Sequence, residues 1–191
     1  MRSLILLCTL VFPSALSAQT APASAAQTQS DLTQALAGDW AGYLEYRDYS
    51  EPPTSTKRVQ LPTWLSIAPT SAGQSWHYIY DDGPTKTVEE TDLVTFHPAD
   101  STYSESDNGK PAQTYQVTGY QAIRSGRGQL ILSGTGTDND KPSETRVTLT
   151  IRRNLIDMLE EVRPAGSTAP FVFRHRYIFT RTHPPALPAA H

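Results

Sequence analysis

Cysteine is almost absent from this sequence. The 191 residues contain one cysteine, Cys8, which lies in an apolar segment close to the N-terminus. We expect that segment to be removed as a signal peptide, which leaves a chain without disulfide bonds or thiol chemistry. Stability must then come from packing and hydrogen bonds alone, even in an exported protein. A lipoprotein anchor on Cys8 is disfavoured because the bulky Leu7 precedes it.

Long apolar segments are missing as well. The apolar run from Leu4 to Phe12 is shorter than the roughly 20 residues that a helix needs to cross a bilayer. The positive charge of Arg2 before it and the small residues up to Ala18 after it are typical of a secretory signal peptide. We therefore predict a signal peptide at residues 1–18, no membrane span, and a secreted protein whose expected compartment is the periplasm.

Charge of one sign does not dominate the chain. Lysine and arginine together number 16, aspartate and glutamate 19, and the formal net charge is −3. The sequence has neither a basic patch with interleaved aromatic residues, as nucleic-acid binding requires, nor a basic amphipathic helix for a membrane surface. It also lacks a Gly-x-Ser-x-Gly elbow, a glycine-rich phosphate loop and a His-Glu-x-x-His motif. We expect no nucleic-acid partner, and the case for an enzyme is weak.

Once the expected signal peptide is removed, both ends of the remaining chain are poor in large apolar side chains. Residues 19–30 contain no aromatic or branched apolar residue, which predicts a disordered leader, and residues 182–191 predict a disordered tail. The segment between them, residues 31–181, has the length of one domain. Within it, residues 31–37 contain helix formers and precede Gly38, which predicts a short helix.

Most of the domain alternates apolar and polar residues, the pattern of half-buried strands. The clearest runs are residues 58–69, 145–152 and 171–181, and turn-forming residues separate the runs. Residues 154–163 fit both helical spacing and alternation, and the short gaps on either side favour a strand. We predict an all-β fold, an antiparallel up-and-down β-barrel of eight to ten strands with a short N-terminal helix. Closure is favoured over an open sandwich because exposed sheet edges promote aggregation.

The first strand is expected to begin at Gly38. Trp40 and Leu44 fall on one of its faces and Tyr43 on the other. Gly38 and Gly42 flank the indole, and glycine in a strand permits a sharp bend or the close approach of another backbone. We expect this segment to pair with the end of the chain.

The Gly-Asp-Trp sequence that ends at Trp40 resembles the Gly-x-Trp signature of the calycin superfamily, which includes lipocalins and fatty-acid-binding proteins. In those barrels an arginine of the last strand packs across this tryptophan, so the resemblance implies that Arg174 or Arg176 covers Trp40. The Thr-Asp-Tyr motif and the usual disulfide of classical lipocalins are absent. The run from Trp40 to Tyr49 is also similar to a group of uncharacterised exported bacterial proteins.

The resemblance implies a barrel with an internal cavity, and aromatic residues are the natural candidates for its wall. His175 lies between two aromatic residues on one face of the last strand. Small haem-binding barrels of the nitrobindin kind use a barrel histidine, although a hydrogen-bonded core histidine is the simpler interpretation. The predicted lining consists of Trp64, Trp76, Tyr78, Tyr80, Phe173, His175 and Tyr177.

Three functions remain open from the sequence. The leading hypothesis is a secreted or periplasmic lipocalin-like barrel that binds a small apolar or amphipathic molecule without catalysis. The first alternative is a haem-binding or enzymatic barrel that uses His175, in the enzyme with a carboxylate such as Asp157. The second is a solidly packed structural or interaction protein of the envelope. We expect no metal site, because the acidic segments at 81–82 and 138–140 have turn-forming sequences and lack the twelve-residue loop of an EF-hand.

Overall fold

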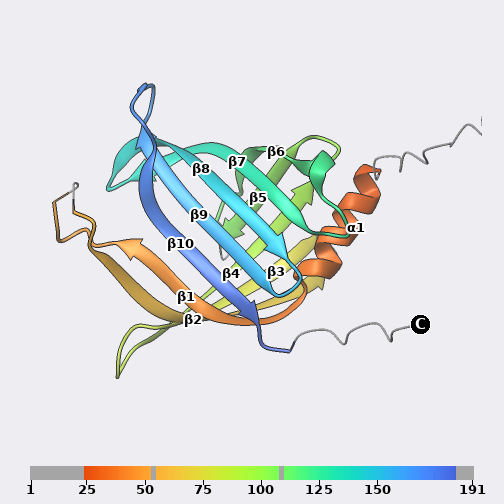
Figure 1. Ribbon diagram of the computed structural model, residues 1–191, viewed down its shortest axis with the longest axis horizontal. Coiled ribbons are helices and arrows are strands. Elements are labelled where there is room, and N and C mark those ends of the chain that lie inside the picture. Colours follow the sequence, from red (N-terminus) through yellow and green to blue (C-terminus); the bar gives the residue numbers. More distant parts are fainter. Residues whose placement is uncertain (1–23, 53–54, 108–109, 184–191) are drawn as a thin grey trace, which may run out of the picture.

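A computed structural model describes residues 24–52, 55–107 and 110–183. In this part of the chain ten strands form a closed antiparallel barrel, in which successive strands pair in order and β10 pairs with β1 (Figure 1). The predicted all-β up-and-down barrel with a short N-terminal helix is confirmed. The predicted signal peptide and the tail beyond residue 183 lie outside the described residues.

The segment with ambiguous spacing, residues 154–163, forms strand β9, as predicted. It is held as a strand because it pairs on one side with β8 and on the other with β10. The elements are, in chain order, α1 (Ala25–Leu36), β1 (Gly38–Arg47), β2 (Arg58–Thr70), β3 (Gly73–Asp81), β4 (Thr87–His97), β5 (Thr102–Asp107), β6 (Gln113–Thr118), the short 3₁₀ helix η1 (Tyr120–Ala122), β7 (Gly128–Asp138), β8 (Lys141–Arg152), β9 (Leu155–Pro164) and β10 (Val172–Arg181).

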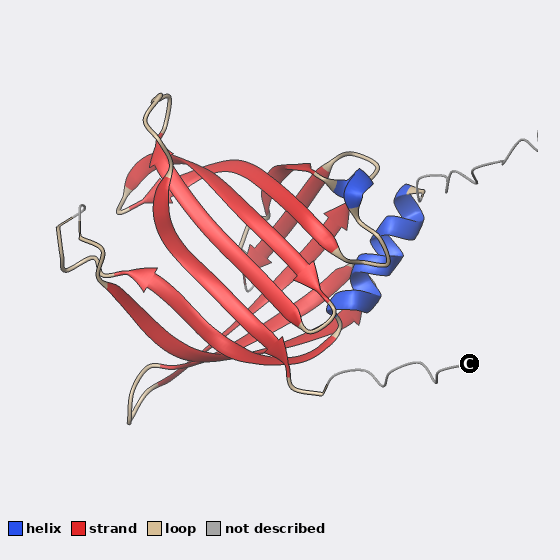
Figure 2. Cartoon of the chain, viewed as in Figure 1, coloured by secondary structure: helices blue, strands red, loops and turns tan. Residues whose placement is uncertain are grey.

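Helix α1 covers one end of the barrel (Figure 2). Thr28, Leu32 and Leu36, four residues apart, form its buried stripe, and Ser24 caps its N-terminus by accepting a hydrogen bond from the backbone of Gln27. Residues 25–30 are therefore helical, and their assignment to a disordered leader was wrong. A helix that buries only one face needs few large apolar residues. No described helix has the length and apolar character required to cross a membrane.

Strand β1 lies between β10 and β2. A Cβ atom at Gly42 would lie 1.8 Å from the carbonyl oxygen of Ile178 on β10, so the close backbone approach expected from this glycine is present. Trp40 is fully buried beside α1, and the guanidinium of Arg181 lies over its ring. The prediction that Arg174 or Arg176 covers Trp40 was therefore wrong. Arg181 is the residue directly opposite Trp40 in the β1–β10 register. Arg174 and Arg176 lie nearer the start of β10, away from Trp40.

The core fills the barrel end nearest α1. Trp40, Trp76 and Phe179 are fully buried there together with the apolar stripe of α1. Beyond them, side chains from β3 to β10 leave a hollow that opens toward the other end of the barrel. This hollow holds the candidate site.

Candidate functional site

The barrel interior contains a cavity of about 210 Å³, to which eight strands contribute side chains. Its wall combines aromatic rings, carboxylates and aliphatic groups, so it is suited to a ligand that has both a polar and an apolar part. The lining consists of five tyrosines (Tyr78, Tyr80, Tyr103, Tyr115 and Tyr177), four carboxylates (Glu90, Asp92, Glu105 and Glu160), His175, and the apolar Leu132, Val147, Leu149 and Met158.

The structure brings four of the seven predicted lining residues to this wall. Tyr78 and Tyr80 are successive inward residues of β3. His175 and Tyr177 are successive inward residues of β10. The tyrosine rings pack together, with Tyr78 stacked on Tyr80 at 5.9 Å between centroids and 5.6 Å from Tyr177. Their role in binding a ligand stays a prediction.

The other three predicted residues lie elsewhere. Trp64 is 45% exposed on the outer face of β2, because its neighbours Thr63 and Leu65 point inward. Trp76 is fully buried in the core beneath the cavity, with its ring 6.5 Å from that of Tyr78. Phe173 does not line the cavity either, and the guanidinium of Arg58 covers its ring at 4.4 Å.

A β-bulge at Arg174 explains the position of Phe173. Phe173 pairs with Glu161 and His175 pairs with Glu160, so Arg174 is an extra residue between them. A bulge shifts the alternation of a strand by one residue. The predicted face that joined Phe173 to His175 is interrupted for this reason.

The same bulge directs two basic side chains, an arginine and a histidine, at one carboxylate. Glu160 accepts a hydrogen bond from Arg174 Nη1 at 2.9 Å, and its other oxygen lies 3.1 Å from His175 Nε2. Burial disfavours the charged form of Glu160 and tends to raise its pKa. The hydrogen bond from His175 and the charges of His175 and Arg174 outweigh burial, so the pKa of Glu160 is lowered. The sequence analysis missed Glu160. The available signal was its place in the inward alternation of β9, between Met158 and Val162.

Glu105 is held by hydroxyl groups instead of cations. Its two oxygens accept hydrogen bonds from Tyr103 at 2.9 Å and from Tyr115 at 3.0 Å. Within the described residues it forms no ion pair. Burial raises the pKa of Glu105, against the opposing effect of the two hydroxyls. The sequence analysis missed this carboxylate too.

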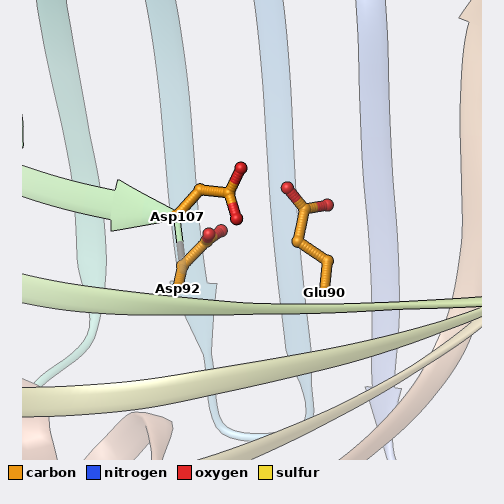
Figure 3. Close-up of side chains that lie close together, drawn as sticks. All are labelled: Glu90, Asp92 and Asp107. Atoms are coloured by element: carbon orange, nitrogen blue, oxygen red, sulfur yellow. The ribbon is translucent and has the colours of Figure 1, made fainter. Parts of the chain in front are cut away.

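Three carboxylates converge where β4 and β5 approach the open end (Figure 3). One oxygen each of Glu90, Asp92 and Asp107 lies within 4.8 Å of the other two. Asp92 and Asp107 are directly opposite each other in the β4–β5 register. Burial, followed by the charges of Glu90, Glu105 and Asp107, raises the pKa of Asp92 to about 7, although Lys110 acts in the opposite direction.

Tyr78, Tyr80 and Tyr177 form a tyrosine cluster whose hydroxyl groups differ in their hydrogen bonds. The Tyr80 hydroxyl donates to Glu90 at 3.1 Å and lies 3.0 Å from that of Tyr177. Tyr78 is only 5% exposed and lines the cavity, and neither of these two hydrogen bonds involves its hydroxyl. As a lining residue, Tyr78 offers its hydroxyl as a hydrogen-bonding group to whatever occupies the cavity.

A second, more open hollow of about 250 Å³ lies at the end of the barrel away from α1. It shares Tyr80, Glu90 and Tyr177 with the cavity wall, and Leu44 and Leu61 add apolar surface. Tyr80 and Tyr177 therefore border both hollows.

Comparisons with known proteins add no assignment. No protein-family model matches the chain, and no curated protein matches its sequence significantly. The ten-strand antiparallel barrel is compatible with a calycin-like fold. The relation to that superfamily therefore stays a resemblance, carried by the Gly-x-Trp signature at Trp40 and by the architecture.

Proposed function

We propose that this protein is an exported barrel that binds a small amphipathic molecule in its internal cavity without chemical change. The observation that supports the proposal is the cavity of about 210 Å³ with a polar and aromatic wall. A cavity of about 150 Å³ holds benzene, whereas pockets for drug-sized ligands begin at about 300 Å³. The expected ligand is therefore about the size of one substituted aromatic ring, and long-chain lipids are disfavoured.

The haem-binding alternative has less support. The Nε2 atom of His175 is engaged by Glu160 at 3.1 Å. In addition, a haem is larger than most drug-sized ligands, and the cavity is smaller than the pockets typical of those ligands. These residues and this volume do not fit a haem.

An enzyme is the second candidate, and one contact favours it. Asp157, the expected partner of His175, forms an ion pair with Arg176 at 2.6 Å and does not line the cavity. Glu160 takes that place, with its carboxylate 3.1 Å from Nε2 of His175, and the neutral imidazole on the cavity wall is the candidate general base. If the protein has a catalytic activity, a folded His175→Gln variant should lose it, and full retained turnover would exclude His175 as the base.

The binding proposal can be tested by tryptophan fluorescence. A Trp64→Phe variant removes the exposed indole, so that emission comes from the buried Trp40 and Trp76. Trp76 packs near Tyr78 and should report occupation of the cavity. Titration with single-ring amphipathic compounds, fatty acids, retinoids and haem should give a saturable change with the single-ring compounds.

Two phenylalanine substitutions provide the matched pair of controls. Val147→Phe adds a ring to the cavity wall, whereas Ile131→Phe adds one to the outer face of β7. Binding should be lost in the first variant and kept in the second. Equal binding by both variants, or no saturable change with any compound, would contradict the proposal. The second result would favour the packed structural protein.

A further inference from the structure

The carboxylates of the cavity are unequally compensated. Glu160 has an arginine and a histidine within hydrogen-bond distance, Arg174 and His175. By contrast, Glu90 and Glu105 are hydrogen-bonded only to tyrosine hydroxyls. On the β3–β5 side of the cavity, Glu90, Asp92 and Glu105 therefore form no ion pair with a cation of the described chain.

Asp92 is the least compensated of these groups. In the described residues it forms neither a hydrogen bond nor an ion pair, and it faces Asp107 directly across the β4–β5 pair. Like charges in that position destabilise a sheet. The charge of Lys110 acts on Asp92, but the exposed ammonium of this lysine pairs with Asp107. Its opposing influence on Asp92 is outweighed, as the raised pKa of Asp92 shows.

An aromatic and hydrogen-bonding surface lies beside this charge. The rings of Tyr78 and Tyr80 are stacked on the adjacent strand, and tyrosine rings attract cations. Tyr78 is 5% exposed and lines the cavity, and its hydroxyl can accept a hydrogen bond from an ammonium group. Opposite these rings, Val147 and Leu149 provide an apolar wall.

We propose that the cavity ligand is an organic cation, a small molecule with one ammonium group and an apolar body about the size of an aromatic ring. The ammonium is held by Asp92 and Glu90 beside Tyr78, and the body packs against Val147 and Leu149. This inference rests on the proposed binding function and specifies the charge of the ligand. A divalent cation is the competing occupant, because the 4.8 Å spacing of the carboxylate oxygens also suits calcium.

Three probes that share a phenyl ring and a short alkyl chain separate charge from shape. Phenethylamine is cationic at neutral pH, phenethyl alcohol is neutral and phenylpropionate is anionic. In calorimetric titrations the amine should bind about tenfold more tightly than the alcohol, as expected for one partly buried charge pair. Phenylpropionate should bind most weakly.

Asp92→Asn removes the charge with little change of shape. This variant should bind phenethylamine about tenfold more weakly and phenethyl alcohol equally well. Asp140→Asn makes the same chemical change in the exposed β7–β8 turn and should leave both affinities unchanged. Tyr78→Phe should weaken binding of the amine more than binding of the alcohol, because it removes only the hydroxyl that accepts a hydrogen bond from the ammonium.

The possible results distinguish the two proposals. If the alcohol or the propionate binds as tightly as the amine, the charge inference is wrong and the binding function stands. If none of the three probes and no compound of the fluorescence panel binds, the binding function itself fails. If calcium binds, depends on Asp92 and is not displaced by the amine, the carboxylates form a metal site and the inference is overturned.

Discussion

The guanidinium carbon of Arg181 lies 4.0 Å from the ring centroid of Trp40. The two residues are directly opposite each other in the pairing of β10 with β1, so the contact joins the last strand to the first. Arg181 also donates hydrogen bonds to the carbonyl oxygens of Ala37 and Ala35 at 2.7 and 2.5 Å. The indole of Trp40 donates to the carbonyl of Leu36 at 2.9 Å. Trp40 and Arg181 thus bind the C-terminal end of α1 at the point where β1 and β10 close the barrel.

Arg181→Ala should lower the free energy of unfolding by about 2–4 kcal/mol, because it removes a cation–π contact and two charge-assisted hydrogen bonds. Arg181→Lys should cost less, since a lysine keeps the charge but not the planar fork. Urea denaturation measures both effects. Arg152→Ala, at an exposed position of β8, is the control and should change stability by less than about 0.5 kcal/mol. An equal loss in both alanine variants would contradict the role of Arg181.

Gly42→Ala should destabilise the barrel severely, by about 3 kcal/mol or more, because its Cβ would overlap the backbone of β10. Gly136→Ala is the matched control in another strand, where the nearest atom to the new Cβ lies 3.7 Å away. Thermal unfolding followed by circular dichroism compares the two variants. Similar melting temperatures for both would show that β1 and β10 do not approach as described.

Trp64→Phe should remove most of the iodide-quenchable tryptophan emission and shift the spectrum to shorter wavelength. Trp64 is the exposed indole, whereas Trp40 and Trp76 are fully buried. Stern–Volmer plots of iodide quenching, recorded on the folded wild type and variant, test this prediction. Strong quenching that persists in the variant would place another tryptophan at the surface.

Glu160→Gln should make stability less dependent on pH in the acidic range. The folded-state pKa of Glu160 is lowered. Its stabilising contribution is therefore present above the unfolded-state pKa of about 4.3 and is lost as the pH falls through the folded-state pKa. At pH 7 the variant should be less stable by about 1–3 kcal/mol, and the difference should shrink in acid.

The control for Glu160 is its neighbour on the outer face of β9. Glu161 forms an ion pair with Arg146 at 2.8 Å on the outside of the barrel. Glu161→Gln should cost no more than about 1 kcal/mol, as is usual for exposed ion pairs. If the two variants show the same pH profile, Arg174 and His175 do not stabilise the ionised form of Glu160.

Asp92→Asn should stabilise the protein above neutral pH. Because burial and neighbouring carboxylates raise the pKa of Asp92 to about 7, the folded state retains a proton that the unfolded state has lost. Wild-type stability must therefore fall as the pH rises from about 4 to about 7. Asparagine avoids this loss, and the gain at pH 8 should be about 1 kcal/mol after solvent screening is considered. Urea denaturation at pH 5 and pH 8 tests it, and a larger gain at pH 5 would contradict the assignment.

The pattern of strands could be predicted because alternation is a local property. On β8, Val147, Leu149 and Ile151 alternate with polar residues and all three point inward. Alternation in β2 puts Trp64 on the face opposite Leu65, yet we included Trp64 in the predicted lining because it is aromatic. The period of the strand, and not the type of side chain, determines the face.

Other parts of the site depend on irregularities that the sequence does not mark. The bulge at Arg174 separates Phe173 from His175 and brings Arg174 beside Glu160. Alternation within one strand does not reveal such an insertion, because a bulge is defined by the pairing with the neighbouring strand. The acidic pair Asp92 and Asp107 likewise exists only through the β4–β5 register.

The sequence by itself determined that residues from Gly38 to Arg181 form a series of antiparallel strands, because each strand and turn carries its own pattern of burial and backbone preference. Only the tertiary structure decided that Arg181 covers Trp40 and that carboxylates of β4, β5 and β9 share one cavity with tyrosines of β3 and β10. Register and closure place these residues side by side, and both depend on contacts between segments distant in the chain.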